Sequence, residues 1–200
     1  MERKEIRSFA CEYRAGENKD GSHYIVGVPI VFGMRTNLGW YDEIIERGAL
    51  KNANLKDVRL LVNHDDNMIP LARSRSNIKD STMKLEIIDG VGLRIKADLD
   101  TENNSDSRSL YSAIERGDIT GMSFAFMVKS DSWDDVDSDH PTRHILEIDY
   151  VSEVSAVTWP AYPQTTINAR GTNPAPAGKR NYSDEDRERD KDRIRILAMM

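Results

Sequence analysis

The stretch Ile119-Thr120-Gly121-Met122-Ser123-Phe124-Ala125-Phe126-Met127-Val128 is almost wholly apolar and decides how the chain folds. A short apolar run that is rich in aromatic and branched residues is typical of a buried β-strand. Ser123 interrupts the run at its centre. A hydroxyl in such a place is costly unless it is hydrogen-bonded, so the sequence predicts a buried strand that carries one chemically capable side chain.

Further strands are expected on both sides of this run. Alternating or continuous apolar residues, bounded by Gly, Asn, Asp and Pro, predict strands at residues 6–13, 24–32, 41–45, 58–63, 83–88, 93–99 and 145–158. Pro29 indicates an edge or a bulge in the second of these strands. Residues 131–139 are strongly acidic and are expected to form a loop.

Helical periodicity is confined to two short places. Ser105 or Asp106 can cap a helix whose apolar stripe contains Leu110 and Ile114, and Gly117 is placed to end it. Residues 47–50 are expected to form a turn that leads into a brief helix. The chain as a whole is therefore predicted to mix strands with a few short helices.

The length of 200 residues fits one domain with a tail. The composition changes abruptly after Arg170, where residues 171–178 are rich in Gly, Pro and Ala, and residues 183–195 alternate acids with bases. We therefore expect a folded domain at residues 1–170 and a flexible charged tail at residues 171–200.

Charge and cysteine content narrow the classes of function. The net charge of −6 argues against a nucleic-acid-binding surface, which normally has a basic excess. The single cysteine, Cys11, excludes an internal disulfide and fits a reducing compartment. No apolar segment is long enough to span a membrane, so a soluble, intracellular protein without membrane partners is expected.

Two further polar residues lie within or at the end of apolar runs. In strict alternation His64 shares a face with Leu60 and Val62, and it stands where that row ends. Glu153 is enclosed by apolar neighbours and should be either paired or protonated, and an imidazole N–H could be its partner. Glu147 and Asp149 on the same strand are competing carboxylates, but they lie outside its most apolar part.

A serine, a histidine and a carboxylate are the parts of a nucleophilic hydrolase, whose members are commonly far apart in sequence. Each residue also has a purely structural interpretation, in which Ser123 fills a small gap and His64 ends a strand. His64 with Asp65 and Asp66 could instead suggest a metal-dependent hydrolase, although a zinc site needs three protein ligands. No metal or cofactor is expected.

Taken together, several segments resemble the prohead (procapsid maturation) proteases of tailed bacteriophages. The resemblance extends from about residue 27 to residue 167. No single motif is specific, but the whole set of motifs in this order is. These motifs are residues 41–50, 60–65, 92–93, 117–124 and 153–163.

The resemblance implies a fold and a set of site residues. The fold class is α+β, a mixed β-barrel surrounded by short helices, as in the herpesvirus assembly proteases. The nucleophile and the base of the family match Ser123 and His64. The third member is a histidine in the herpesvirus proteins, whereas the matching position here is Glu153.

The resemblance also implies a function. It is that of a serine endopeptidase that cleaves scaffold and capsid-protein segments, and itself, during maturation of the phage procapsid. The implied partners are a scaffold protein, or the scaffold domain of the major capsid protein, and the capsid shell; a homo-oligomer is left open. The implied location is the immature procapsid in the cytoplasm of the bacterial host. The alternative is a non-catalytic assembly protein that keeps the fold and binds capsid or scaffold.

Overall fold

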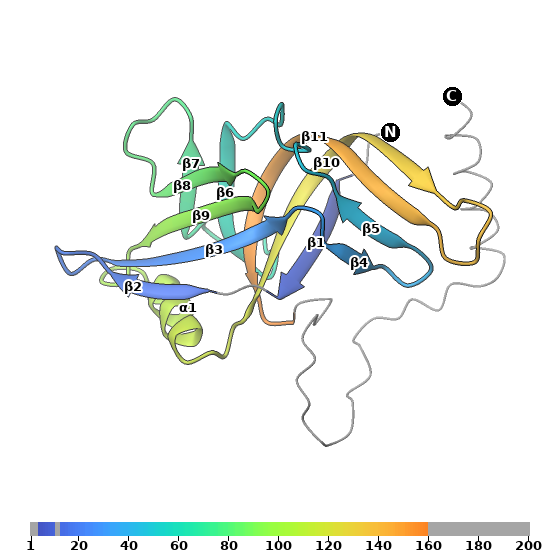
Figure 1. The fold of residues 1–200 in the computed structure, drawn as a ribbon. Coiled ribbons are helices and arrows are strands. Elements are labelled where there is room, and N and C mark those ends of the chain that lie inside the picture. Colours follow the sequence, from blue (N-terminus) through green and yellow to red (C-terminus); the bar gives the residue numbers. More distant parts are fainter. Residues whose placement is uncertain (1–3, 11–12, 160–200) are drawn as a thin grey trace, which may run out of the picture.

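The computed structural model describes residues 4–10 and 13–159, and this part of the chain forms two β-sheets and one helix (Figure 1). The elements are β1 (Glu5–Ala10), β2 (Arg14–Glu17), β3 (His23–Val31), β4 (Arg35–Asn37), β5 (Asp42–Ile45), β6 (Asp57–Val62), β7 (Ala72–Arg75), β8 (Met83–Ile88), β9 (Gly92–Leu99), α1 (Ser105–Glu115), β10 (Gly121–Asp134) and β11 (Thr142–Val157).

A long antiparallel hairpin of β10 and β11 runs through the middle of the molecule (Figure 1). Strand β1 pairs antiparallel with the outer edge of β10. The first part of β11 pairs in parallel with β5, and its last part pairs in parallel with β6. With β4 and β7 added, these strands form a seven-stranded sheet. Ser123 and Glu153 lie on this hairpin, and His64 follows β6, which pairs with the end of β11.

The second sheet has the order β2-β3-β9-β8. The buried side chains of its strands join those of the first sheet in one apolar core, to which Phe124 and Phe126 of β10 contribute fully buried rings. Ala125 and Ser123 alternate with these rings, so β10 is buried on both faces, as its apolar sequence predicts. The bulge expected near Pro29 is confirmed by an irregular register between Gly27 and Ile30.

The single helix of the described residues begins earlier than expected, because neither Ser105 nor Asp106 is its cap. Its N-cap is Asn104, whose side chain accepts hydrogen bonds from the backbone N–H groups of Asp106 and Ser107. Gly117 follows the helix with a left-handed φ of 77°, which confirms its predicted role as the end signal. Leu110 and Ile114 are buried, as the stripe predicted.

The fold expected from the resemblance needs correction in its helices. The described part of the chain is mostly β-sheet, and the surrounding ring of short helices is not found there. Residues 47–50 form turns and no helix, because Gly48 takes a left-handed φ of 92° and interrupts the helical backbone.

The predicted acidic loop at residues 131–139 is also partly wrong. Strand β10 continues to Asp134, and the turn into β11 is centred near Asp135, which has a positive φ of 54°. In this extension Asp131 forms an ion pair with Arg143 of β11, with 2.6 Å between Oδ2 and Nε. Cross-strand ion pairs allow acidic residues to continue a ladder that a pattern of charges alone does not suggest.

The tail predicted at residues 171–200, and with it the domain boundary at residue 170, lies outside the described residues. Within the described part, no helix is long and apolar enough to cross a membrane.

Candidate active site

Ser123 lies in a row of residues that crosses four strands. It is the Cα partner of Ser8 on β1 and of Ser155 on β11, and Ser155 is in turn the partner of Leu61 on β6. Partners in neighbouring strands point to the same side of a sheet. The row therefore places three serine side chains on one face, and all three are buried.

His64 does not continue the core-facing row of Leu60 and Val62, as strict alternation predicted. Asn63 and His64 both have left-handed backbone conformations, with φ of 51° and 60°, directly after the end of β6. This turn ends the alternation and carries His64 to the other face, where its backbone N–H points to Ser155 Oγ at 3.3 Å. Left-handed residues other than glycine are uncommon and frequently mark a functional constraint.

His64 and Glu153 are in direct contact. Their Nδ1 and Oε1 atoms are 2.7 Å apart, and the Glu153 side chain is only 5% exposed. The second carboxylate oxygen, Oε2, accepts a hydrogen bond of 2.6 Å from Ser155 Oγ. Both oxygens of this buried carboxylate thus have partners, as a buried charge requires. With Nδ1 donating to Glu153, the neutral imidazole has its lone pair on Nε2, which is the arrangement that a general base needs.

Ser155 was not singled out by the sequence, although it links the other site residues. Its hydroxyl donates to Glu153 and accepts from the backbone of His64, and it stands opposite Ser123 in the register. The signal that could have revealed it is its place two residues after Glu153, because residues i and i+2 of a strand share a face.

The hydroxyl of Ser123 is not bonded to His64 in this structure. Its Oγ donates to the backbone carbonyl of Arg7 at 2.8 Å and accepts from Ser8 Oγ at 2.9 Å. His64 Nε2 is buried and has no hydrogen-bond partner. The structure therefore brings His64 and Glu153 together, while Ser123 is held by β1.

The competing carboxylates lie elsewhere. Glu147 forms an ion pair with Lys129 at 2.7 Å and its side chain is 41% exposed, and Asp149 is exposed. Irregularities in the β10–β11 register separate them from the Glu153 end of the strand. Neither has the burial that distinguishes Glu153.

The metal interpretation finds no geometric support. Asp65 Oδ1 accepts a hydrogen bond of 3.0 Å from the backbone of Asn67, which closes a local turn. Within residues 4–10 and 13–159, no three His, Cys, Asp or Glu side chains are grouped so that they could hold an ion.

Two clefts flank the His64 turn. A cleft of about 280 Å³ is lined by His64 and Glu153, with Arg59, Leu61 and Lys4 among its other walls. It opens on the same face of the sheet as Ser123, since Glu153 and Ser155 share that face. Ser123 itself does not line it, because β1 covers the hydroxyl.

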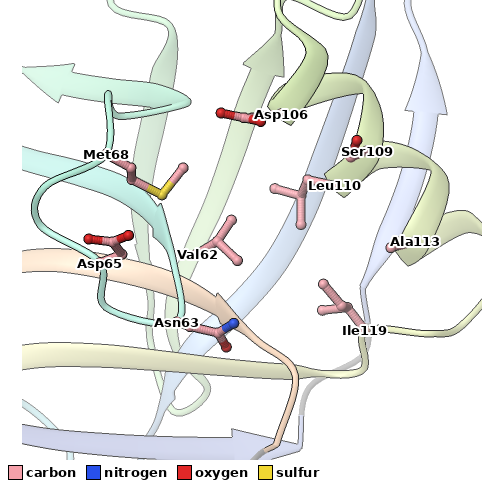
Figure 2. A pocket seen from close by; sticks show the side chains of 9 residues that line it. All are labelled: Val62, Asn63, Asp65, Met68, Asp106, Ser109, Leu110, Ala113 and Ile119. Atoms are coloured by element: carbon pink, nitrogen blue, oxygen red, sulfur yellow. The ribbon is translucent and has the colours of Figure 1, made fainter.

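A larger cleft of about 510 Å³ lies on the opposite side of the turn. Figure 2 shows Asp106 and Leu110 of α1 on one side of it and Met68 and Asp65 of the β6–β7 loop on the other. Its wall includes Val62, whose side chain faces away from Ser123. The larger cleft is thus separate from the His64–Glu153 pair.

A buried serine on a central strand, together with a histidine that is paired with a buried carboxylate of the neighbouring strand, is the residue set of a serine hydrolase. The sequence pattern of the caudovirus prohead serine proteases matches residues 9–179, and the chain belongs to this family. Family membership assigns to the chain a serine protease activity and a role in procapsid maturation. It confirms the resemblance found in the sequence.

Comparison with solved structures finds the bacteriophage T4 capsid assembly protease, gp21. The two chains are 14% identical, and the similarity covers 77% of this chain and 96% of the T4 chain with a TM-score of 0.46. No curated protein matches the sequence.

Proposed function

We propose that Ser123 is the nucleophile of this protease, that His64 is its general base and acid, and that Glu153 orients and stabilises the histidine. The observation that carries the proposal is the 2.7 Å contact between His64 Nδ1 and Glu153 Oε1, which leaves the lone pair of Nε2 available. Ser123 lies on the neighbouring strand β10, two residues before Ala125, which is the Cα partner of Glu153. Ser123 and Ala125 are on the same face of the sheet.

The reaction follows from these roles. Ser123 Oγ attacks the carbonyl carbon of the scissile peptide bond, and its proton passes to His64 Nε2. The histidine gives that proton to the leaving amine, which departs and leaves an acyl group on Ser123. Water then attacks the acyl group and gives a proton to the same histidine. The carboxylic acid product leaves, and the histidine returns the proton to Ser123 Oγ.

Glu153 acts on the charged form of the histidine. When His64 holds the second proton, an imidazolium faces a buried carboxylate and the two charges attract. Ser155 holds that carboxylate in place through Oε2, so Oε1 stays directed at Nδ1. The buried pair thus supplies both the correct tautomer and the stabilisation of the positive charge.

The proposed substrates are scaffold segments, segments of the capsid protein, and the tail of the chain itself. The site of action is the interior of the immature procapsid in the bacterial cytoplasm. There, confinement with the scaffold gives a high effective concentration of substrate. Residues 171–200 serve in this proposal as a tail that is removed or that contacts the shell, and a chain ending at Arg170 is expected to fold and to remain active.

Co-expression with the major capsid protein and the scaffold tests the function. Wild-type chain is expected to shorten the substrate, and Ser123→Ala is expected to lower the rate by about 10⁴- to 10⁶-fold. Covalent labelling by a fluorophosphonate identifies the nucleophile by peptide mass. If the Ser123→Ala chain shortened the substrate at the wild-type rate, the assignment of Ser123 would be wrong. Normal co-assembly without any cleavage by the wild-type chain would support the non-catalytic alternative.

A further inference from the structure

Strand β1 engages the hydroxyl of Ser123 on both its donor and its acceptor side. The proton of Oγ is directed to the Arg7 carbonyl, and a lone pair of Oγ receives the Ser8 hydroxyl. A serine in this state cannot give its proton to an imidazole. Ser123 is fully buried, so no peptide can reach it while β1 is in place.

His64 Nε2 is the complementary observation. It is buried without a hydrogen-bond partner, although buried polar atoms are nearly always satisfied. The rest of this histidine is well held, through Nδ1 by Glu153 and through its backbone by Ser155. Nδ1 of the imidazole is thus held by Glu153, whereas Nε2, the atom that accepts a proton from a nucleophile, has no partner.

The position of β1 is that of an added peptide strand. It is the outermost strand of the sheet, and its whole length pairs antiparallel with β10 across Ser123. Without it, β10 would be an open edge, which is where extended peptides bind by adding a strand. A peptide paired in the same way would place a backbone carbonyl next to Ser123 Oγ, as the Arg7 carbonyl is placed now.

The segment before β1 also reaches the paired residues. Lys4 lines the same cleft as His64 and Glu153. The N-terminal part of the chain therefore covers the serine and borders the cleft of the histidine.

Ion pairs fasten β1 to the sheet from the side. Arg7 makes two hydrogen bonds to the buried carboxylate of Glu43 on β5, and Glu5 pairs with Arg143 of β11 at 2.8 Å. These contacts join β1 to strands that it does not pair with through its backbone. These non-covalent contacts favour the covered state, and they must break when β1 leaves.

We propose that β1 is a displaceable inhibitory strand that occupies, on the edge of β10, the place of an extended peptide substrate. The family match begins at residue 9, so most of β1 lies before the matched range. The proposal rests on the proposed role of Ser123. The protease is inactive while β1 is paired, and it becomes active when β1 leaves and Ser123 can donate to His64 Nε2.

A reversible tether tests the proposal. Ile6 and Ala125 are Cα partners on β1 and β10, so Ile6→Cys with Ala125→Cys, in a Cys11→Ala background, can form a disulfide that locks β1 in place. The matched control is Glu86→Cys with Arg94→Cys, a partner pair in the other sheet. A second variant lacks residues 1–8 and keeps the family-matched range. The readouts are the rate at which a fluorophosphonate labels Ser123 and the cleavage of fluorescein-labelled casein.

In the oxidised, tethered chain the fluorophosphonate is expected to label Ser123 at least about tenfold more slowly than in the same chain after reduction. The control pair should show no difference between its oxidised and reduced forms. The chain lacking residues 1–8 should label at least about tenfold faster than wild type, and a peptide of residues 1–10 should slow it again. If Ser123 is labelled equally fast in the oxidised and the reduced tethered chain, the proposal is overturned, whether or not the shortened chain folds. If Ser123 is labelled in neither the reduced tethered chain nor the shortened chain, the proposed function is overturned instead.

Discussion

Replacing Glu153 with glutamine tests the proposed active site most directly, because the change removes a charge and little else. The glutamine has nearly the same shape, and its amide can reverse the polarity of one contact. Its carbonyl oxygen can accept from His64 Nδ1, and its NH₂ group can donate to Ser155 Oγ, so both contacts of the present carboxylate have neutral counterparts. The variant is therefore expected to fold and to keep the orientation of the imidazole.

The loss then consists mainly of the attraction between the carboxylate and the imidazolium. With Nδ1 and Oε1 2.7 Å apart, the centres of the two charged groups are about 4 Å apart. At an effective dielectric constant of about 20, that separation corresponds to about 4 kcal/mol. Each 1.36 kcal/mol is about a factor of ten in rate, so Glu153→Gln should lower kcat/KM by about a thousandfold.

The assay is cleavage of the co-expressed scaffold, followed with time, together with fluorophosphonate labelling of Ser123. The matched control is Glu147→Gln on the same strand, whose carboxylate pairs with an exposed lysine and should change the rate by less than about twofold. A Glu153→Gln chain within about tenfold of wild type would refute the proposed role of the carboxylate. A near-total loss in Glu147→Gln, with none in Glu153→Gln, would transfer that role to Glu147.

Three further outcomes are expected. Ser155→Ala removes a buried hydrogen bond to a carboxylate and should lower the free energy of unfolding by about 1.5–3 kcal/mol in urea titrations; Ser107→Ala, whose buried hydroxyl has no partner, is the control and should change it far less. Gly92→Ala would place a Cβ 1.8 Å from a backbone carbonyl of β3 at a φ of 151°, and it should cost about 3 kcal/mol or more in thermal unfolding. Burial raises the pKa of Glu5, but the hydrogen bond and charge of Arg143 outweigh this and lower it overall. The folded state is therefore favoured above the ordinary pKa of about 4.5 and loses this contribution as the pH falls below it, so Glu5→Gln should show a shallower acid-side fall in stability than wild type.

The strands could be predicted from the sequence because their apolar residues recur with a period of two or in continuous runs. The residues of β10 around Ser123 and the strands predicted at residues 83–88 and 93–99 follow these patterns closely. The continuation of β10 through Asp131 could not be predicted in this way. It carries an ion pair with Arg143 of β11, and a sequence pattern does not identify partners on another strand.

In the candidate site, too, some residues could be predicted from the sequence pattern, and others depend on contacts between strands. Ser123 and Glu153 stand out because a polar residue within an apolar run needs a partner, and that need is visible in the sequence. The face on which His64 lies was predicted incorrectly, since alternation assumes an extended backbone and two left-handed residues end it. Ser155 was missed because a serine in a strand is ordinary until the register places it between Ser123 and the backbone of His64.

The state of the nucleophile is the property that the sequence reveals least. Arg7 and Ser123 are 116 residues apart, and the contact between them uses a backbone carbonyl, which every residue has. The other contact comes from the Ser8 hydroxyl, and a serine in a strand does not by itself mark that strand as one that binds another serine. In the proposed mechanism the contact with Arg7 keeps the proton of Ser123 directed to a carbonyl, while Nε2 of His64 has no hydrogen-bond partner. The residue types thus define the chemistry that is available, whereas the order of strands in the sheet determines whether that chemistry can begin.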